Sequence, residues 1–193
     1  GKLRTSFDVN VTQQGTYKIF LASGGLNARW EDAEGKRAFW PARGEKANPA
    51  DFETAVPMDA KNIQVTQGSR RIETFVTLGK PSLQALAPTN VGLELVPITH
   101  PNDLAVSEPA EFKFLMDGKP AVGAKITVIA GGTRYRNAAD ELELETDKNG
   151  IVKIQWKALG VYWLGASYKD EKAQKPAKIR SGSYSATLEV LAE

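Results

Sequence analysis

The only histidine of the chain, His100, is the first residue to consider for chemistry. It lies in the sequence Thr99-His100-Pro101, and the carboxylates of Asp103 and Glu108 follow it closely. A nickel or copper site favours several imidazole ligands, and one histidine with two carboxylates is a poor set. The favoured interpretation is therefore a solvated or hydrogen-bonded loop histidine, with a metal ligand as the alternative.

Three aromatic residues, Trp30, Phe39 and Trp40, flank a long irregular stretch of the sequence. Aromatic side chains on loops can stack on sugars or form a protein-binding patch. The favoured alternative is that they plug the end of a β-sandwich. They are nevertheless the best candidate for a ligand-binding surface, because a long ordered loop in a compact domain often has a role.

The sequence offers no recognisable catalytic set. It has no cysteine, which excludes disulfides, thiolate metal sites and a catalytic thiol. A Ser-His-Asp triad would have to use His100, and no Gly-x-Ser-x-Gly elbow occurs. The Gly-Lys-Ser/Thr loop that cradles phosphate is also missing. We therefore expect a protein that is not an enzyme and that needs no cofactor.

Composition and charge narrow the class of protein further. Of 193 residues, 41% are apolar and 25% are charged, which is ordinary for a folded domain. The net charge of +2, from 25 basic and 23 acidic residues, provides little attraction for nucleic acid. No apolar run approaches the length of about 18 residues that a membrane-spanning helix needs. We expect no nucleic-acid partner and no transmembrane segment in this chain.

The elements that must position any site are predicted to be β-strands. Apolar and polar residues alternate along much of the chain, which is typical of strands with one face on a core and one in water. Asp117-Gly118 and Asn149-Gly150 separate such runs, and these pairs tolerate the positive φ angles of tight hairpins. The clearest alternating runs are 7–11, 112–116, 124–128, 152–156 and 184–190.

The order of these runs predicts an all-β fold of two tandem immunoglobulin-like β-sandwich domains. The second domain is assigned to residues 85–193, which hold seven or eight strand candidates. The first is assigned to residues 1–84, where strands are fewer, and we expect it to be incomplete at its N-terminus. The only helical turn is predicted around Pro49–Ala55, with Asn48 as its cap.

A short internal sequence similarity supports the prediction of two sandwiches. The segment that begins Gly15-Thr-Tyr17 resembles the one that begins Gly160-Val-Tyr162, and apolar strand-like residues follow both. A Gly-x-Tyr entry into a strand is typical of a tyrosine corner, whose hydroxyl hydrogen-bonds to nearby backbone. Each of the two tyrosines is therefore predicted to anchor the start of a strand.

Motifs in the second half carry a resemblance to known families. The run Pro88-Thr-Asn-Val-Gly-Leu-Glu-Leu-Val-Pro97 is followed by Phe112-Lys-Phe-Leu-Met-Asp-Gly-Lys-Pro120 and closes on Tyr184-Ser-Ala-Thr-Leu-Glu-Val190. This order resembles an exported bacterial family of unknown function that was once labelled a nickel-uptake substrate-specific component. The segments 118–124, 146–150 and 160–162 are also similar to carboxypeptidase-regulatory or transthyretin-like β-sandwiches.

The resemblance implies an exported, periplasmic protein whose signal peptide has been removed, and we expect natural sequence upstream of Gly1. It favours a non-enzymatic binding or accessory protein, with an envelope protein or a transported ligand as partner. One alternative is an accessory component of nickel or cobalt uptake. Another is a carbohydrate-binding module that uses the region from Trp30 to Trp40.

Overall fold

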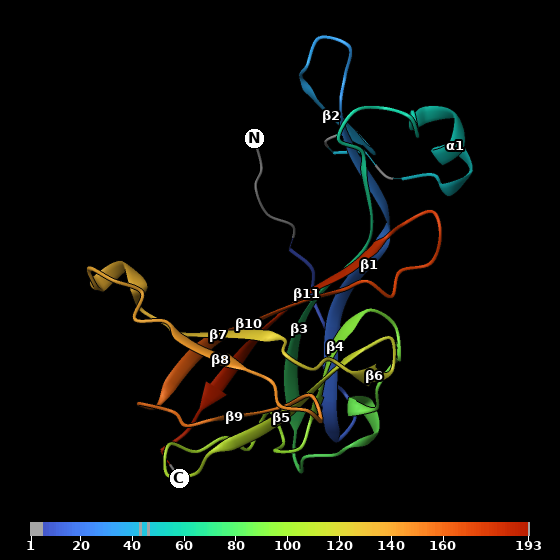
Figure 1. Ribbon diagram of the computed structural model, residues 1–193. Helices are drawn as coiled ribbons and strands as arrows, with labels where there is room; N and C mark the ends of the chain where they lie inside the picture. The colour runs from blue at the N-terminus through green and yellow to red at the C-terminus, as the bar shows by residue number, and fades with distance from the viewer. Residues whose placement is uncertain (1–5, 43, 46, 193) are drawn as a thin grey trace.

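The computed structural model describes residues 6–42, 44–45 and 47–192, and in them the chain forms two packed β-sheets (Figure 1). The predicted all-β sandwich is confirmed. The helical segments have only three or four residues each, and none in the described part has the length and apolar character needed to cross a membrane. They are η1 (Pro49–Asp51), α1 (Phe52–Ala55), η2 (Gln84–Leu86) and η3 (Thr133–Tyr135).

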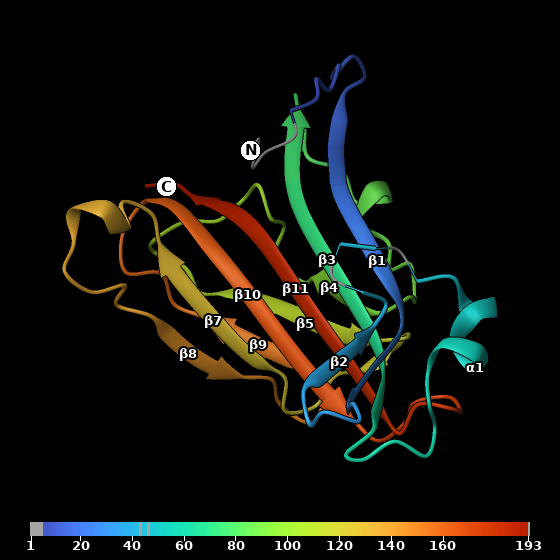
Figure 2. The ribbon, with the colours of Figure 1, turned by 90° about the horizontal axis from the view of Figure 1, so that it is seen from above.

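The larger sheet has seven strands, and Figure 2 shows most of them side by side. Its central feature is the parallel pairing of β3 with β11, which runs from Thr66 opposite Ile179 to Thr74 opposite Thr187. All other pairs in this sheet are antiparallel. In spatial order the strands are β2 (Arg37–Trp40), β1 (Gly15–Glu31), β3 (Gln64–Leu78), β11 (Ile179–Val190), β10 (Gly160–Asp170), β7 (Lys125–Ala130) and β8 (Leu142–Glu145).

The smaller sheet is built around β5, which pairs with every other member of that sheet. Its turn into β6 has positive φ angles at Asp117 and Gly118, as the Asp-Gly pair predicts. This sheet covers one face of the larger sheet. Its strands are β4 (Leu93–Pro97), β5 (Ala110–Met116), β6 (Lys119–Pro120) and β9 (Ile151–Ile154).

Side chains from both sheets meet in one large apolar core. Phe112 and Phe114 of β5 are fully buried against residues such as Leu164 of β10 and Ile126 of β7. The alternation that predicted strands at 112–116 and 124–128 is thus explained by burial of every second side chain.

A second, small core lies at the far end of β1 and β3. It consists of Ala28, Trp40, Phe52, Val56, Val65 and Ala177. Ala177 comes from the loop between β10 and β11, so both halves of the chain contribute to it. The larger sheet likewise contains strands from residues 1–84 and from residues 85–193. The boundary between two domains stays a prediction.

One predicted strand is wrong. Residues 7–11 alternate in polarity, yet they form no strand, and Phe7 is 59% exposed. An alternating segment becomes a strand only when a neighbouring strand accepts its backbone hydrogen bonds, and this segment pairs with none of the described strands. The predicted helical turn is confirmed, and Asn48 caps it by accepting the N–H of Ala50 at 3.3 Å.

Both predicted tyrosine corners are present. The hydroxyl of Tyr162 donates to the carbonyl of Ala158 at 2.7 Å and accepts the N–H of the same residue at 3.1 Å. Tyr17 makes the same pair of bonds with Gln13, at 3.0 and 2.7 Å. Each hydroxyl therefore closes the turn four residues upstream and fixes where its strand begins.

The two corners differ in burial, which makes them a matched pair for mutation. We expect Tyr162→Phe to lower the free energy of unfolding by about 1–2 kcal/mol, because two backbone groups lose their partner beside the core. Tyr17→Phe removes the same bonds where water can replace them, so its loss should stay below about 0.5 kcal/mol. Urea unfolding of both variants measures this, and equal losses would contradict the argument.

Candidate functional site

His100 lies in the loop between β4 and β5 and is held by hydrogen bonds on both ring nitrogens. Its Nδ1 accepts the N–H of Asn102 at 3.1 Å. In the neutral ring the proton is thereby assigned to Nε2, which lies 3.0 Å from Oγ1 of Thr16 and 3.4 Å from the carbonyl of Ser82. The ring ties this loop to the start of β1.

This pairing of a hydroxyl with an imidazole is not arranged as a nucleophile and a base. A base needs an unprotonated Nε2, whereas here the N–H of Asn102 directs the proton onto that atom. Across the described ranges, no three histidine, aspartate or glutamate side chains are grouped to hold a metal ion. The role of His100 as a metal ligand stays a prediction.

The predicted aromatic surface is divided between two faces of the sheet. Ala28 of β1 lies opposite Trp40 of β2, and Arg29 lies opposite Phe39. Trp40 is only 9% exposed and meets Phe52 edge-on at 5.1 Å between ring centroids. Phe39 is 58% exposed on the opposite face.

Trp30 is partly buried against the same small core as Trp40. Trp30 and Trp40 thus pack at the end of the molecule, and Phe39 is the most exposed of the three rings. Their assignment as ligand-binding residues stays a prediction, but the three rings do not form one flat platform.

A different aromatic residue is exposed on the larger sheet. We call the face of this sheet that points away from the smaller sheet the outer face. Tyr162, Leu164 and Ala166 of β10 are buried on the inner face, so the residues between them lie on the outer face. There, Trp163 is 44% exposed.

The indole of Trp163 lies over Gly165, two residues along the same strand. A Cβ atom added to Gly165 would come within 2.7 Å of Cζ2 of that ring, a separation that real Cβ atoms do not tolerate. The missing side chain at Gly165 therefore makes room for the indole on the sheet. The ring is held along β10 and still has solvent access.

Polar residues form a row across four strands, level with Ser167 and four positions along β10 from Trp163. Ser167 of β10 pairs with Lys125 of β7 and with Ser183 of β11, which in turn pairs with Arg70 of β3. The row bounds a shallow hollow of about 310 Å³ that Trp163, Thr127 and Ser185 also line. We call this hollow the Trp163 site.

The two cations of the site differ in their partners. Lys125 forms an ion pair with Glu145 of β8. Arg70 has no carboxylate within ion-pair distance in the part of the chain that the structure describes. The free positive charge of the site is therefore that of Arg70.

Sequence reasoning missed this site. In the segment Gly160–Ala166, the sequence pattern was interpreted only as a tyrosine corner formed by Tyr162. The period of two already placed Trp163 and Gly165 on the face opposite to that tyrosine. Which residues of other strands lie beside them depends on the register of β3, β11 and β7, which the sequence does not display.

Under the outer face lies a buried polar network. Arg71 of β3 donates to Glu73 at 3.1 Å, and the hydroxyl of Tyr184 donates to the other oxygen of that carboxylate at 2.8 Å. Arg71 also donates to Oγ1 of Thr89, which donates to the buried carboxylate of Glu94. Each charged group has partners, as burial requires.

The pKa of Tyr184 is shifted by its position in this network. Burial is the main cause that raises the pKa of Tyr184 well above its ordinary value, and the adjacent carboxylate of Glu73 raises it further. The phenol therefore stays protonated and serves as a hydrogen-bond donor. The network is a structural support beneath the outer face.

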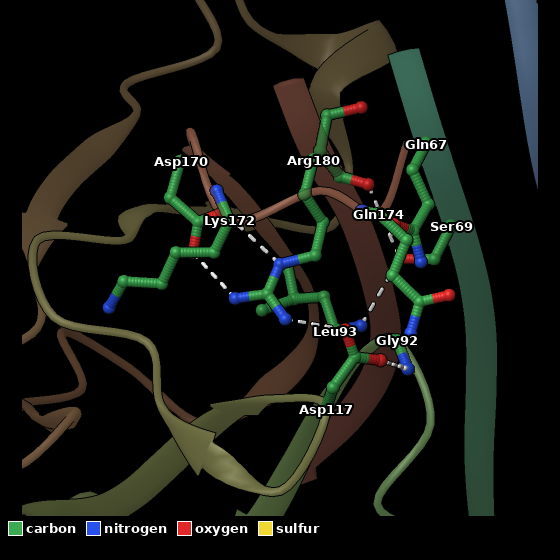
Figure 3. Close-up of polar contacts among 10 residues, drawn as sticks. Gln67, Ser69, Gly92, Leu93, Asp117, Asp170, Lys172, Gln174 and Arg180 are labelled. Carbon is green, nitrogen blue, oxygen red and sulfur yellow. Dashed lines mark hydrogen bonds and ion pairs between the residues drawn. The ribbon is translucent and has the colours of Figure 1, made fainter. Parts of the chain in front are cut away.

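A second polar cluster, shown in Figure 3, connects the two sheets. Arg180 at the start of β11 donates to both oxygens of Asp170, at 3.1 and 2.5 Å, and to Asp117 at 2.6 Å. Asp170 ends β10, whereas Asp117 lies in the β5–β6 turn and accepts the N–H of Gly92. We call Arg180, Asp170 and Asp117 the inter-sheet clamp.

The contacts of the inter-sheet clamp shift the pKa values of Asp170 and Arg180. Burial, the largest influence on Asp170, raises the pKa of its carboxyl group. The hydrogen bonds from Arg180 and from the N–H of Lys172 more than offset this, so the pKa of Asp170 lies below its ordinary value. The hydrogen bond to Asp170 in turn raises the pKa of Arg180.

Together, these features define an all-β sandwich protein whose larger sheet leaves one face open. The chain belongs to the family described as Domain of unknown function (DUF4198), whose model matches residues 1–170 of the 193. No curated protein and no solved structure matches the chain. The family description names neither a ligand nor a reaction.

The clamp predicts a specific dependence of stability on pH. The pKa of Asp170 is lower in the folded than in the unfolded protein. The ionised carboxylate therefore contributes fully to stability at pH values above its unfolded pKa of ~3.9. That contribution is lost as the pH falls through the folded value. We expect Asp170→Asn to cost about 2 kcal/mol at pH 7, with the difference from wild type shrinking below about pH 4.

Denaturant unfolding at several pH values measures this difference. The control is Asp8→Asn, since Asp8 is exposed and outside every strand, and its curve should follow wild type throughout. A gap between Asp170→Asn and wild type that stays constant down to pH 2 would contradict the assignment.

Proposed function

We propose that this protein is a non-enzymatic, exported binding or accessory module that uses the Trp163 site to contact its ligand. The observation that carries the proposal is an exposed indole that lies over Gly165, in a hollow also lined by an arginine that no carboxylate neutralises in the described part of the chain. Its placement in the periplasm rests on the family resemblance stated above.

The residue types of this surface are suited to binding. Covering an exposed indole releases water from a large apolar area, and tryptophan and arginine are the residues most enriched where binding energy concentrates. Gly165 leaves room for the ring, and the buried network of Arg71 and Glu73 supports β3 beneath Arg70.

The aromatic residues near the far end supply less. Trp40 is already covered by Phe52, so a ligand gains nothing from it without opening the small core. Phe39 is exposed, and Arg29 beside it already donates two hydrogen bonds to Gln64. This makes Phe39 a suitable control for Trp163.

We expect ligand binding to depend on Trp163 and not on Phe39. A thermal-shift panel of neutral and acidic glycans, extended peptides and nickel or cobalt salts would identify ligands of the full chain, since a ligand that binds the folded state raises its melting temperature. Trp163→Ala should weaken binding of each such ligand at least about 10-fold. Phe39→Ala should leave binding unchanged.

Two results would contradict the proposal. One is a ligand that binds wild type and Trp163→Ala equally well. The other is a rise in melting temperature with nickel or cobalt that survives Trp163→Ala, which would instead favour the metal-uptake alternative.

A further inference from the structure

We infer that the Trp163 site binds an acidic sugar, a pyranose ring that carries a carboxylate, as in a hexuronic acid unit of a polysaccharide. This inference rests on the proposed function and names the ligand class of the same site. It moves the predicted sugar platform from the region of Trp30 and Trp40 to the outer face of the larger sheet.

The indole supplies the apolar half of the recognition. A pyranose presents a face of C–H groups, and the face of an aromatic ring is electronegative, so the two attract when they stack. The ring of Trp163 lies along β10 over Gly165 and has solvent on it. The ring borders the hollow of about 310 Å³.

Arg70 supplies the charged half. Its guanidinium has no ion-pair partner among residues 6–42, 44–45 and 47–192, and its planar fork matches a carboxylate with two parallel hydrogen bonds. Lys125, three strands away and thus roughly 14 Å across the sheet, is already paired with Glu145. Arg70 and the indole of Trp163 line the same hollow, so one free cation and one aromatic ring within it fit one carboxylate per bound unit.

The hydroxyl groups of the site complete the match. Ser167, Ser183, Ser185 and Thr127 lie on the outer face between Arg70 and Lys125. None of the four side chains forms a hydrogen bond within the described ranges. A hydroxyl both donates and accepts, as sugar hydroxyls do, so these groups can exchange water for a sugar without leaving a polar atom unpaired.

Other polyanions fit less well. Nucleic acid needs a row of cations that follows the phosphates, and this site has only Arg70 free among the described residues. A neutral glycan would stack on Trp163 but would cover the guanidinium of Arg70 without pairing it, which costs binding energy.

The test uses the full chain and two probes that differ only in charge. Oligogalacturonate carries a carboxylate on each ring, and its methyl ester has the same rings without the charge. By isothermal titration calorimetry we expect the acid to bind and the ester to bind roughly 10- to 100-fold more weakly, the effect of one charge-assisted hydrogen-bonded pair.

Three variants separate the contributions. Arg70→Gln should weaken the acid roughly 10-fold or more and leave the ester unchanged. Trp163→Ala should weaken both probes. Gly165→Ala displaces the indole from its position over residue 165. This variant should also weaken binding of both probes, although it retains the tryptophan. Arg29→Gln and Phe39→Ala, on the far half of the sheet, should bind the acid like wild type.

The outcomes distinguish the ligand class from the site. If no acidic probe binds, or if acid and ester bind equally, the acidic-sugar inference is overturned. If another ligand of the panel needs Trp163, the proposed function still stands. If the acid binds Trp163→Ala as tightly as wild type, both are overturned, because the sugar then lies elsewhere.

Discussion

The parallel pairing of β3 with β11 is the constraint on which the rest of the structure depends. It joins the strand that ends at Leu78 to the last strand of the chain, over nine successive residue pairs from Thr66 to Thr74. Through this ladder, β1 and β2 join the same sheet as β10 and β7. The same ladder places Arg70 beside Ser183 and so creates the outer face as a continuous surface.

Buried charged groups join neighbouring strands of the larger sheet and also connect the two sheets. Glu73, Arg71 and Tyr184 join β3 to β11 from beneath, while Arg180 joins the end of the β10–β11 hairpin to the β5–β6 turn of the smaller sheet (Figure 3). Such groups are costly to bury and are strongly destabilising when one partner is removed. They stabilise one register of the strands, and that register decides which residues lie side by side on the outer face.

The outer face combines an apolar ring, a free guanidinium and several hydroxyls within one patch. No catalytic geometry accompanies them at His100, whose proton is directed onto Nε2 by the backbone of Asn102. This combination is the basis of the proposed binding role. Gly165 contributes to the site by leaving room for the indole, because a side chain there would collide with the ring.

The sequence by itself determined the local features of this protein, and only the tertiary structure decided how they meet. The period of two predicted the strands of the main core, and Gly-x-Tyr predicted both corners, since each depends on residues within a few positions. The strand at 7–11 failed because a strand needs a partner. The sequence marked Trp40 as a binding candidate, but packing against Phe52 buried it. Arg70 and Trp163 are far apart in the chain and share a surface only through the pairing of β3, β11 and β10.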